Sequence, residues 1–166
     1  MKKIKSLLGL LLGTAAVLCV VIASQLAPVA ADAQTENNGL VQLSSNFSVS
    51  ETGDRLEALL EERRLTLMAR IDHAQNAASV GKELRPTELF IFGNPAVGTP
   101  LMQCNQSVAI DLPQKILIWE DASEQVQLAY NDPEYLLARH QLEACEPVIE
   151  RVSQVLEDIA MRVAGS

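Results

Sequence analysis

The stretch LFIFGNPAVGTPLMQC, residues Leu89–Cys104, decides how the chain is organised. It starts with a four-residue apolar run of the length expected for a buried strand, and it continues into a segment with two glycines and two prolines. Gly93 and Gly98 lie five residues apart, but the Lys-Ser/Thr pair of a phosphate-binding P-loop does not follow them, so the spacing predicts no nucleotide site. We therefore expect a strand that is followed by a rigid crossover loop.

The N-terminal 33 residues have the three parts of a secretory signal. A basic start, MKKIKS, precedes an apolar run of 17 residues and a small-residue exit, where Ala31 and Ala33 fit the AxA cleavage rule. The apolar run is shorter than the ~20 residues of a spanning helix, so an uncleaved anchor is the alternative. We expect cleavage near Gln34, a flexible tether at residues 34–40, a periplasmic location and no stable membrane insertion afterwards.

The charge of the chain argues against nucleic acid as a partner. Removing residues 1–33 takes away three lysines and one aspartate, so the formal net charge of −8 becomes −10 for the mature chain. A phosphate backbone selects basic surfaces, and this surface repels it. The remaining length is that of one domain, which we place at residues 41–166.

The first part of that domain predicts a strand and then a helix. Val41, Leu43, Phe47 and Val49 are apolar at period two, which is typical of a half-buried strand. Ser48, with a glutamate three residues later, has the spacing of a capping box and predicts a helix start.

Later segments alternate in the same way. LTLMARI, LFIF, KILIW and QVQLAY predict strands, and the last two are joined by EDASE as a hairpin. HAQNAASVG predicts a short helix. Asp132 before Pro133 is an N-cap with proline at the first helical position, and Glu146 before Pro147 suggests the same device for an amphipathic closing helix.

This order predicts an α+β fold, with an antiparallel sheet of about five strands and helices on one face. The runs LFIF and ILIW lack clean alternation between apolar and polar residues. We therefore expect a partner subunit on the second sheet face.

Three blocks together, LRPTELFIFGNPAVGTPLMQ, IDLPQKILIWED and YNDPEYLLARH, resemble the domain of unknown function 302 family of exported bacterial proteins. The resemblance covers roughly Val41 to His140. It implies an α+β fold similar to the TATA-binding-protein-like arrangement and often a homodimer. It implies no established activity and no cofactor, and it carries over no functional residue.

A candidate ligand site follows from the irregular segments. Consecutive N–H groups in a glycine turn can form a nest for an anion, and the YND corner offers further polar groups. We expect a shallow pocket for an unidentified small molecule, and the residues predicted to line it are Asn94, Pro95, Gly98, Thr99, Asn131 and Asp132. The alternative is a purely structural role, in which the segment is a rigid loop that binds no ligand.

The cysteines and histidines define a second candidate. The mature chain holds two cysteines, Cys104 and Cys145, and an even count in an exported protein predicts an intramolecular disulfide. The alternative is a thiol-based redox or soft-metal protein that uses Cys104, Cys145 and His140. A histidine at the end of a helix such as His140 also complements the helix dipole.

The sequence shows no catalytic constellation. No GxSxG elbow is present, and neither His73 nor His140 lies in a recognisable catalytic context. Asp111 pairs with no other acid in the sequence pattern, so an acid/base pair is unsupported. We therefore favour a binding or accessory module over an enzyme.

Overall fold

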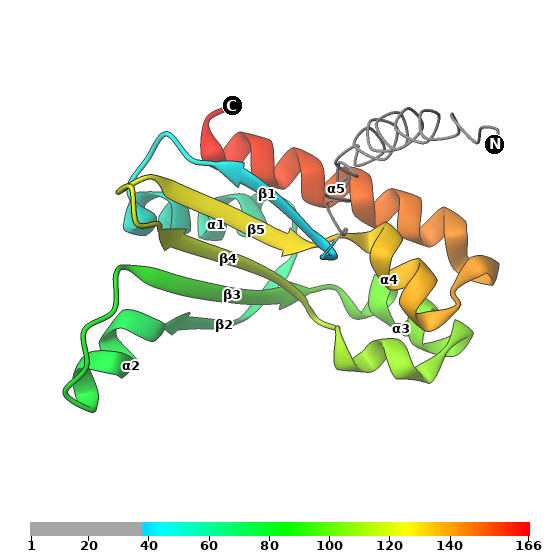
Figure 1. Cartoon of the computed structure of the whole chain (residues 1–166). Helices are drawn as coiled ribbons and strands as arrows, with labels where there is room; N and C mark the ends of the chain where they lie inside the picture. The colour runs from blue at the N-terminus through cyan, green and yellow to red at the C-terminus, as the bar shows by residue number, and fades with distance from the viewer. Residues whose placement is uncertain (1–37) are drawn as a thin grey trace, which may run out of the picture. The chain divides into compact units, whose positions relative to one another are not determined.

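Five antiparallel strands form one sheet in the order β1-β5-β4-β3-β2 (Figure 1). The computed structural model describes residues 38–166, so the predicted signal and most of the tether lie outside the described residues. The strands are β1 (Leu40–Ser44), β2 (Thr66–Asp72), β3 (Thr87–Gly93), β4 (Gln114–Glu120) and β5 (Val126–Asn131). The predicted α+β class with an antiparallel five-stranded sheet is confirmed.

Helices occupy most of the connections between the strands. They are α1 (Val49–Glu62), α2 (His73–Ser79), α3 (Pro95–Cys104), α4 (Pro133–His140) and α5 (Glu146–Ala164), with two 3-10 turns, η1 (Gln106–Ile110) and η2 (Glu143–Cys145). Along residues 38–166, no helix is both long and apolar enough to cross a membrane.

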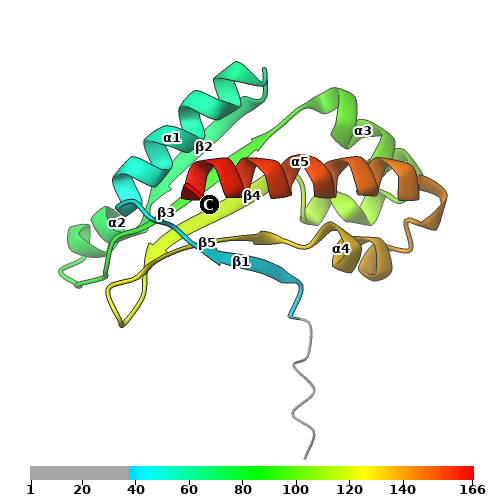
Figure 2. The ribbon, with the colours of Figure 1, turned by 90° about the horizontal axis from the view of Figure 1, so that it is seen from above.

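Helices α1 and α5 lie over one face of the sheet (Figure 2). The strands send alternate side chains to that face, where Phe90, Ile116 and Leu128 are fully buried. Burial of this apolar surface is the main favourable term for the fold. We call this cluster the main core; its central members are Leu56, Leu60, Phe90, Phe92, Ile116, Ile118, Leu128, Leu156 and Ile159.

The opposite face of the sheet also carries apolar side chains. Because neighbours along a strand point to opposite faces, Leu89, Leu117 and Trp119 lie on the side away from the buried Phe90, Ile116 and Ile118. These three are only half-buried. We call the half-buried apolar side of β2, β3 and β4 the open face.

A second apolar cluster lies beyond the sheet, at the end where α3 and α4 are found (Figure 2). Its buried members are Leu101, Val108, Leu142 and Ile149, from α3, η1, the turn after α4 and the start of α5. We call it the minor core. It fixes the position of α3 and η1 relative to the first turns of α5.

Two predicted helix starts are confirmed by their caps. The Ser48 hydroxyl accepts a hydrogen bond from the Glu51 N–H at 3.2 Å, and the Asp132 carboxylate accepts one from the Glu134 N–H at 3.0 Å. The predicted strand to Val49 is wrong in its second half. The strand ends at Ser44, and Val49 begins α1 because the Ser48 cap ends the extended backbone there.

The predicted crossover loop after β3 is also wrong. Residues Pro95–Cys104 form α3, which Asn94 caps by accepting a hydrogen bond from the Ala96 N–H at 2.9 Å. Asn94-Pro95 is the same cap-then-proline device that starts α4. The device predicted at Glu146 is absent from the described start of α5, because the N-cap there is Cys145 and it makes no side-chain cap.

Candidate functional site

An apolar pocket of about 240 Å³ lies beside α3. The end of β3 and the start of β4 flank it, and Leu101 and Val152 contribute buried surface to its floor. Its surface is mostly carbon, with few polar groups. The lining residues are Met68, Gly93, Asn94, Pro95, Val97, Gly98, Thr99, Leu101, Met102, Ala109, Leu112, Pro113, Gln114 and Val152.

Four of the six predicted ligand residues lie in this lining: Asn94, Pro95, Gly98 and Thr99. The other two lie elsewhere. Asn131 pairs with Leu40 of β1, and Asp132 caps α4 while its N–H donates to the Gly39 carbonyl. Asp132 therefore has a structural role at the start of α4, and the pocket is formed without the YND corner.

The predicted anion nest is not formed by this segment, because its backbone is helical. The N–H groups of Val97 and Gly98 both donate to the Asn94 carbonyl, at 2.9 and 3.0 Å, and the Asn94 side chain takes the Ala96 N–H. These donors are therefore engaged within the helix start. The apolar lining suits an uncharged ligand better than an anion.

Residues that sequence reasoning missed complete the pocket. Met68 lies at the register shift of β2 and is half-exposed, while Met102 and Leu112 come from α3 and from the segment after η1. They belong to separate elements, so no local motif unites them. The signal that was available is Asn94-Pro95, which marks a helix start and predicts that the following apolar residues line one face.

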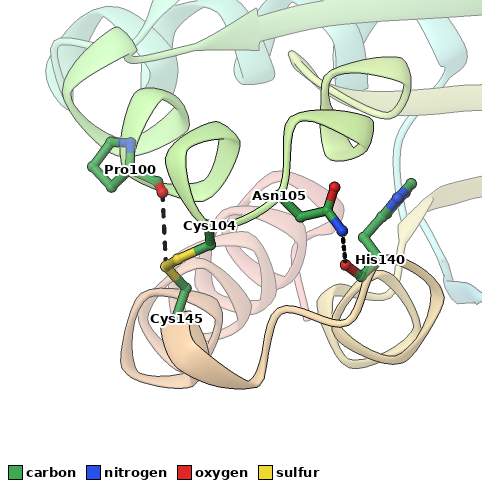
Figure 3. Close-up of a disulfide and its surroundings, with 5 residues drawn as sticks. All are labelled: Pro100, Cys104, Asn105, His140 and Cys145. Carbon is green, nitrogen blue, oxygen red and sulfur yellow. Dashed lines mark hydrogen bonds between the residues drawn. A yellow bond between two sulfur atoms is a disulfide. The ribbon is translucent and has the colours of Figure 1, made fainter.

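Cys104 and Cys145 lie next to each other as a disulfide pair between the end of α3 and η2 (Figure 3). Their Cα atoms are 6.4 Å apart, within the ~7 Å that a disulfide requires. This pair joins two segments of the minor core. Oxidation of the pair stays a prediction.

The imidazole of His140 turns away from the two cysteines (Figure 3). Its Nδ1 lies 2.8 Å from the Ser107 hydroxyl and its Nε2 lies 2.6 Å from the Asp111 carboxylate. Both ring nitrogens are therefore engaged outside the cystine. Among residues 38–166, no group of three or more His, Cys, Asp or Glu side chains is placed to hold a metal ion. The alternative ligand set Cys104, Cys145 and His140 is thus not assembled.

A charge cluster joins α1, β2 and β3. Arg70 donates to Glu88 at 2.7 Å, to Asp54 at 2.8 Å and to Glu57 at 3.2 Å. The hydrogen bond to Glu88 is the largest cause of an Arg70 pKa raised above its ordinary value, and burial opposes it. The three carboxylates neutralise the Arg70 guanidinium, which lies over the Phe90 ring. None of these charged residues lines the pocket beside α3.

The fold and the site define a small α+β domain with an apolar pocket near the Cys104–Cys145 pair. The chain belongs to the family described as Domain of unknown function DUF302, whose model matches residues 41–159. An uncharacterised conserved DUF302 protein from Bacillus stearothermophilus, known from a crystal structure, superposes with a TM-score of 0.68. The match covers 75% of this chain and 98% of that chain at 16% identity, so it shows the fold alone.

Curated relatives come from Brucella. Proteins named fluoride-specific ion channel FluC 1 from Brucella suis biovar 1 and Brucella abortus biovar 1 are 44% identical to this chain over 106 residues. The aligned part is 64% of this chain but only 42% and 39% of those proteins. The chain thus spans about two fifths of the length of the relatives it matches.

Proposed function

We propose that the chain is an exported, homodimeric accessory domain that binds a small, uncharged apolar molecule in the pocket beside α3. The apolar lining of a preformed cavity carries this proposal. A cavity of ~150 Å³ holds benzene, so about 240 Å³ suits a ligand of roughly 8–12 non-hydrogen atoms.

A thermal-shift screen with alkyl and aromatic fragments of that size tests the binding. We expect several fragments to raise the unfolding temperature of the mature protein, because a ligand of the folded state stabilises it by mass action. The blocking variant is Gly98→Leu. A Cβ at position 98 lies 3.8 Å from the Leu112 side chain, so a leucine there extends into the pocket without a backbone clash.

The matched control is Val80→Leu, which enlarges a side chain that is 71% exposed and outside the pocket. Fragments that stabilise the parent protein and Val80→Leu, but not Gly98→Leu, support the pocket. If no fragment stabilises the parent, or if Gly98→Leu responds as the parent does, the binding role is wrong.

The open face supports the homodimer. Leu89, Leu117 and Trp119 are half-buried on a sheet face that neither α1 nor α5 covers. A second copy that places the same face against it would bury this surface by two-fold symmetry. Sedimentation velocity should give a dimer for the mature protein and a monomer for Trp119→Glu, while Gln154→Glu, at an exposed position of α5 on the other face of the sheet, stays dimeric. A monomeric parent at concentrations well above micromolar contradicts this part of the proposal.

The Brucella relatives favour the accessory role. There, a segment similar to this chain is part of longer proteins that are named as fluoride channels. We propose that the domain assists a larger partner and does not itself bind fluoride, since an acidic chain repels anions. The unfolding temperature should be the same in sodium fluoride and in sodium chloride of equal ionic strength. A rise specific to fluoride would overturn this and indicate an ion-binding domain.

A further inference from the structure

A serine in η1, the aspartate that follows η1 and the histidine that ends α4 form a hydrogen-bonded chain. The Ser107 Oγ lies 2.8 Å from His140 Nδ1, and the His140 Nε2 lies 2.6 Å from Asp111 Oδ2. Ala109 and Leu112, from the same segment, line the pocket. No local motif marks these three residues, because the serine and the histidine are 33 residues apart and lie on different elements.

The hydrogen-bond inventory of the three groups gives one proton arrangement for a neutral imidazole beside an ionised carboxylate. The carboxylate only accepts, so in this arrangement His140 Nε2–H donates a hydrogen bond to Asp111. Nδ1 is then the unprotonated nitrogen and accepts from the Ser107 hydroxyl. A hydroxyl, a basic nitrogen within hydrogen-bond reach and a third group that orients the base are the parts of an activated nucleophile. In the serine protease triad, Nε2 contacts the serine and Nδ1 contacts the aspartate, whereas here the two nitrogens are exchanged. The serine, the histidine and the aspartate have the same roles in both arrangements.

The three residues of this hydrogen-bonded chain differ in how deeply they are buried. The side chains of His140 and Asp111 are 6% and 13% exposed, whereas Ser107 is exposed. The histidine is held from its backbone side as well, since the Asn105 amide donates to the His140 carbonyl at 2.7 Å (Figure 3). Here the base is fixed and shielded, while the serine hydroxyl belongs to an exposed residue.

We propose that Ser107 is a nucleophile that is acylated by small carboxylic esters, with His140 as the base and Asp111 as a positioning residue. The Ser107 Oγ attacks the ester carbonyl while its proton moves to His140 Nδ1. The C–O bond to the alcohol then breaks, and the proton passes from Nδ1 to the leaving oxygen, which leaves an acyl-serine. Water repeats the sequence and releases the acid, so one ester and one water give one acid and one alcohol.

Covalent labelling of the mature protein tests the nucleophile directly. An alkyl fluorophosphonate reacts with an activated serine by forming an Oγ–P bond and expelling fluoride. We expect peptide mass spectrometry to find the phosphonate on Ser107, and to find labelling there about a hundredfold faster than on Ser123, which is exposed in the β4–β5 turn. Activation should disappear when the same protein is unfolded in urea. Equal labelling of both serines, or labelling of Ser107 that survives unfolding, overturns the proposal.

Variants separate the roles of the three groups. Ser107→Ala should lose both the label and the hydrolysis of 4-nitrophenyl acetate, whereas Ser123→Ala keeps both. His140→Gln should slow labelling of Ser107 about a hundredfold. Asp111→Asn should lower kcat for the ester with KM unchanged, which a merely structural role would not produce. If His140→Gln does not fold, the comparison of native and urea-unfolded parent protein still decides. Ester hydrolysis that persists in Ser107→Ala contradicts the nucleophile.

Discussion

The main core and the minor core are stabilised in different ways. In the main core, long strands and two helices bury large side chains such as Phe90 and Ile118 completely. In the minor core, four buried residues from short elements are supplemented by a cystine and by side-chain hydrogen bonds. The pocket lies where the two cores meet, since Val152 belongs to the main core and Leu101 to the minor core, and the Ser107–His140–Asp111 chain lies beside the minor core.

This contrast shows where the fold leaves room for function. Dense packing at the centre of the main core, around Phe90 and Ile116, transmits any change in volume to its neighbours. The minor core is held by a few specific bonds around a partly open apolar cavity. Such regions open at lower free energy than a packed sheet, and binding sites are commonly found in them.

The largest expected effect comes from removing the cystine. The double variant Cys104→Ser, Cys145→Ser frees a loop of 41 residues, which lowers the free energy of unfolding by about 4 kcal/mol in the chain-closure model. Urea titration of the oxidised parent and of the variant measures this. Hydrogen exchange should speed up in α3 and α4 more than in β3 and β4. Uniform acceleration across the sheet would show that the two cores are not separable in this way.

A matched pair of glycine substitutions compares the two regions with the same chemical change. At Gly53 in α1, an added Cβ would lie 2.7 Å from the Phe90 ring, so Gly53→Ala should destabilise by about 1–3 kcal/mol through overpacking. At Gly98 in α3, the added Cβ has 3.8 Å to its nearest neighbour, and Gly98→Ala should stabilise by roughly 0.5–1 kcal/mol because alanine favours the helix. Urea midpoints that move in opposite directions confirm the contrast. A shared sign would refute it.

The smallest expected effect concerns the turn of the hairpin formed by β4 and β5. Asp121 accepts hydrogen bonds from the Gln127 side chain at 2.9 Å and from the Ser123 and Gln125 N–H groups. The Gln127 bond is the largest cause of an Asp121 pKa below its ordinary value. A carboxyl with a lowered folded pKa adds stability above its unfolded pKa of ~3.9, and that stability is lost as the pH falls through the folded pKa.

Carbon-13 NMR of the Asp121 carboxyl should therefore show a titration midpoint below that of an unfolded peptide. Gln127→Leu should move the midpoint upward, because it removes the leading hydrogen bond. A midpoint at the ordinary value in the parent would show that the turn is not held by this carboxylate.

The sheet and its helices were predictable because their signals are local. Caps such as Ser48 and Asp132 and the period-two strands require only neighbouring residues. Edge strand β1 pairs with β5, where Leu43 lies opposite Leu128, 85 positions later in the sequence. This pairing exists only in the folded chain. The site residues could not all be predicted for the same reason, because they come together only in the folded chain. Glycines and Pro100 concealed α3, and Ser107 and His140 meet only after α4 has packed beside η1.

The most direct test of the pocket is an amide chemical-shift map of the protein with a fragment that raises its unfolding temperature. We predict that the largest shifts fall in α3, η1 and the first residues of β4, that amides of the open face around Leu117 and Trp119 stay unchanged, and that Gly98→Leu abolishes the shifts. Shifts centred on the open face, or a map that Gly98→Leu leaves unaltered, would contradict the assignment of binding to the pocket beside α3.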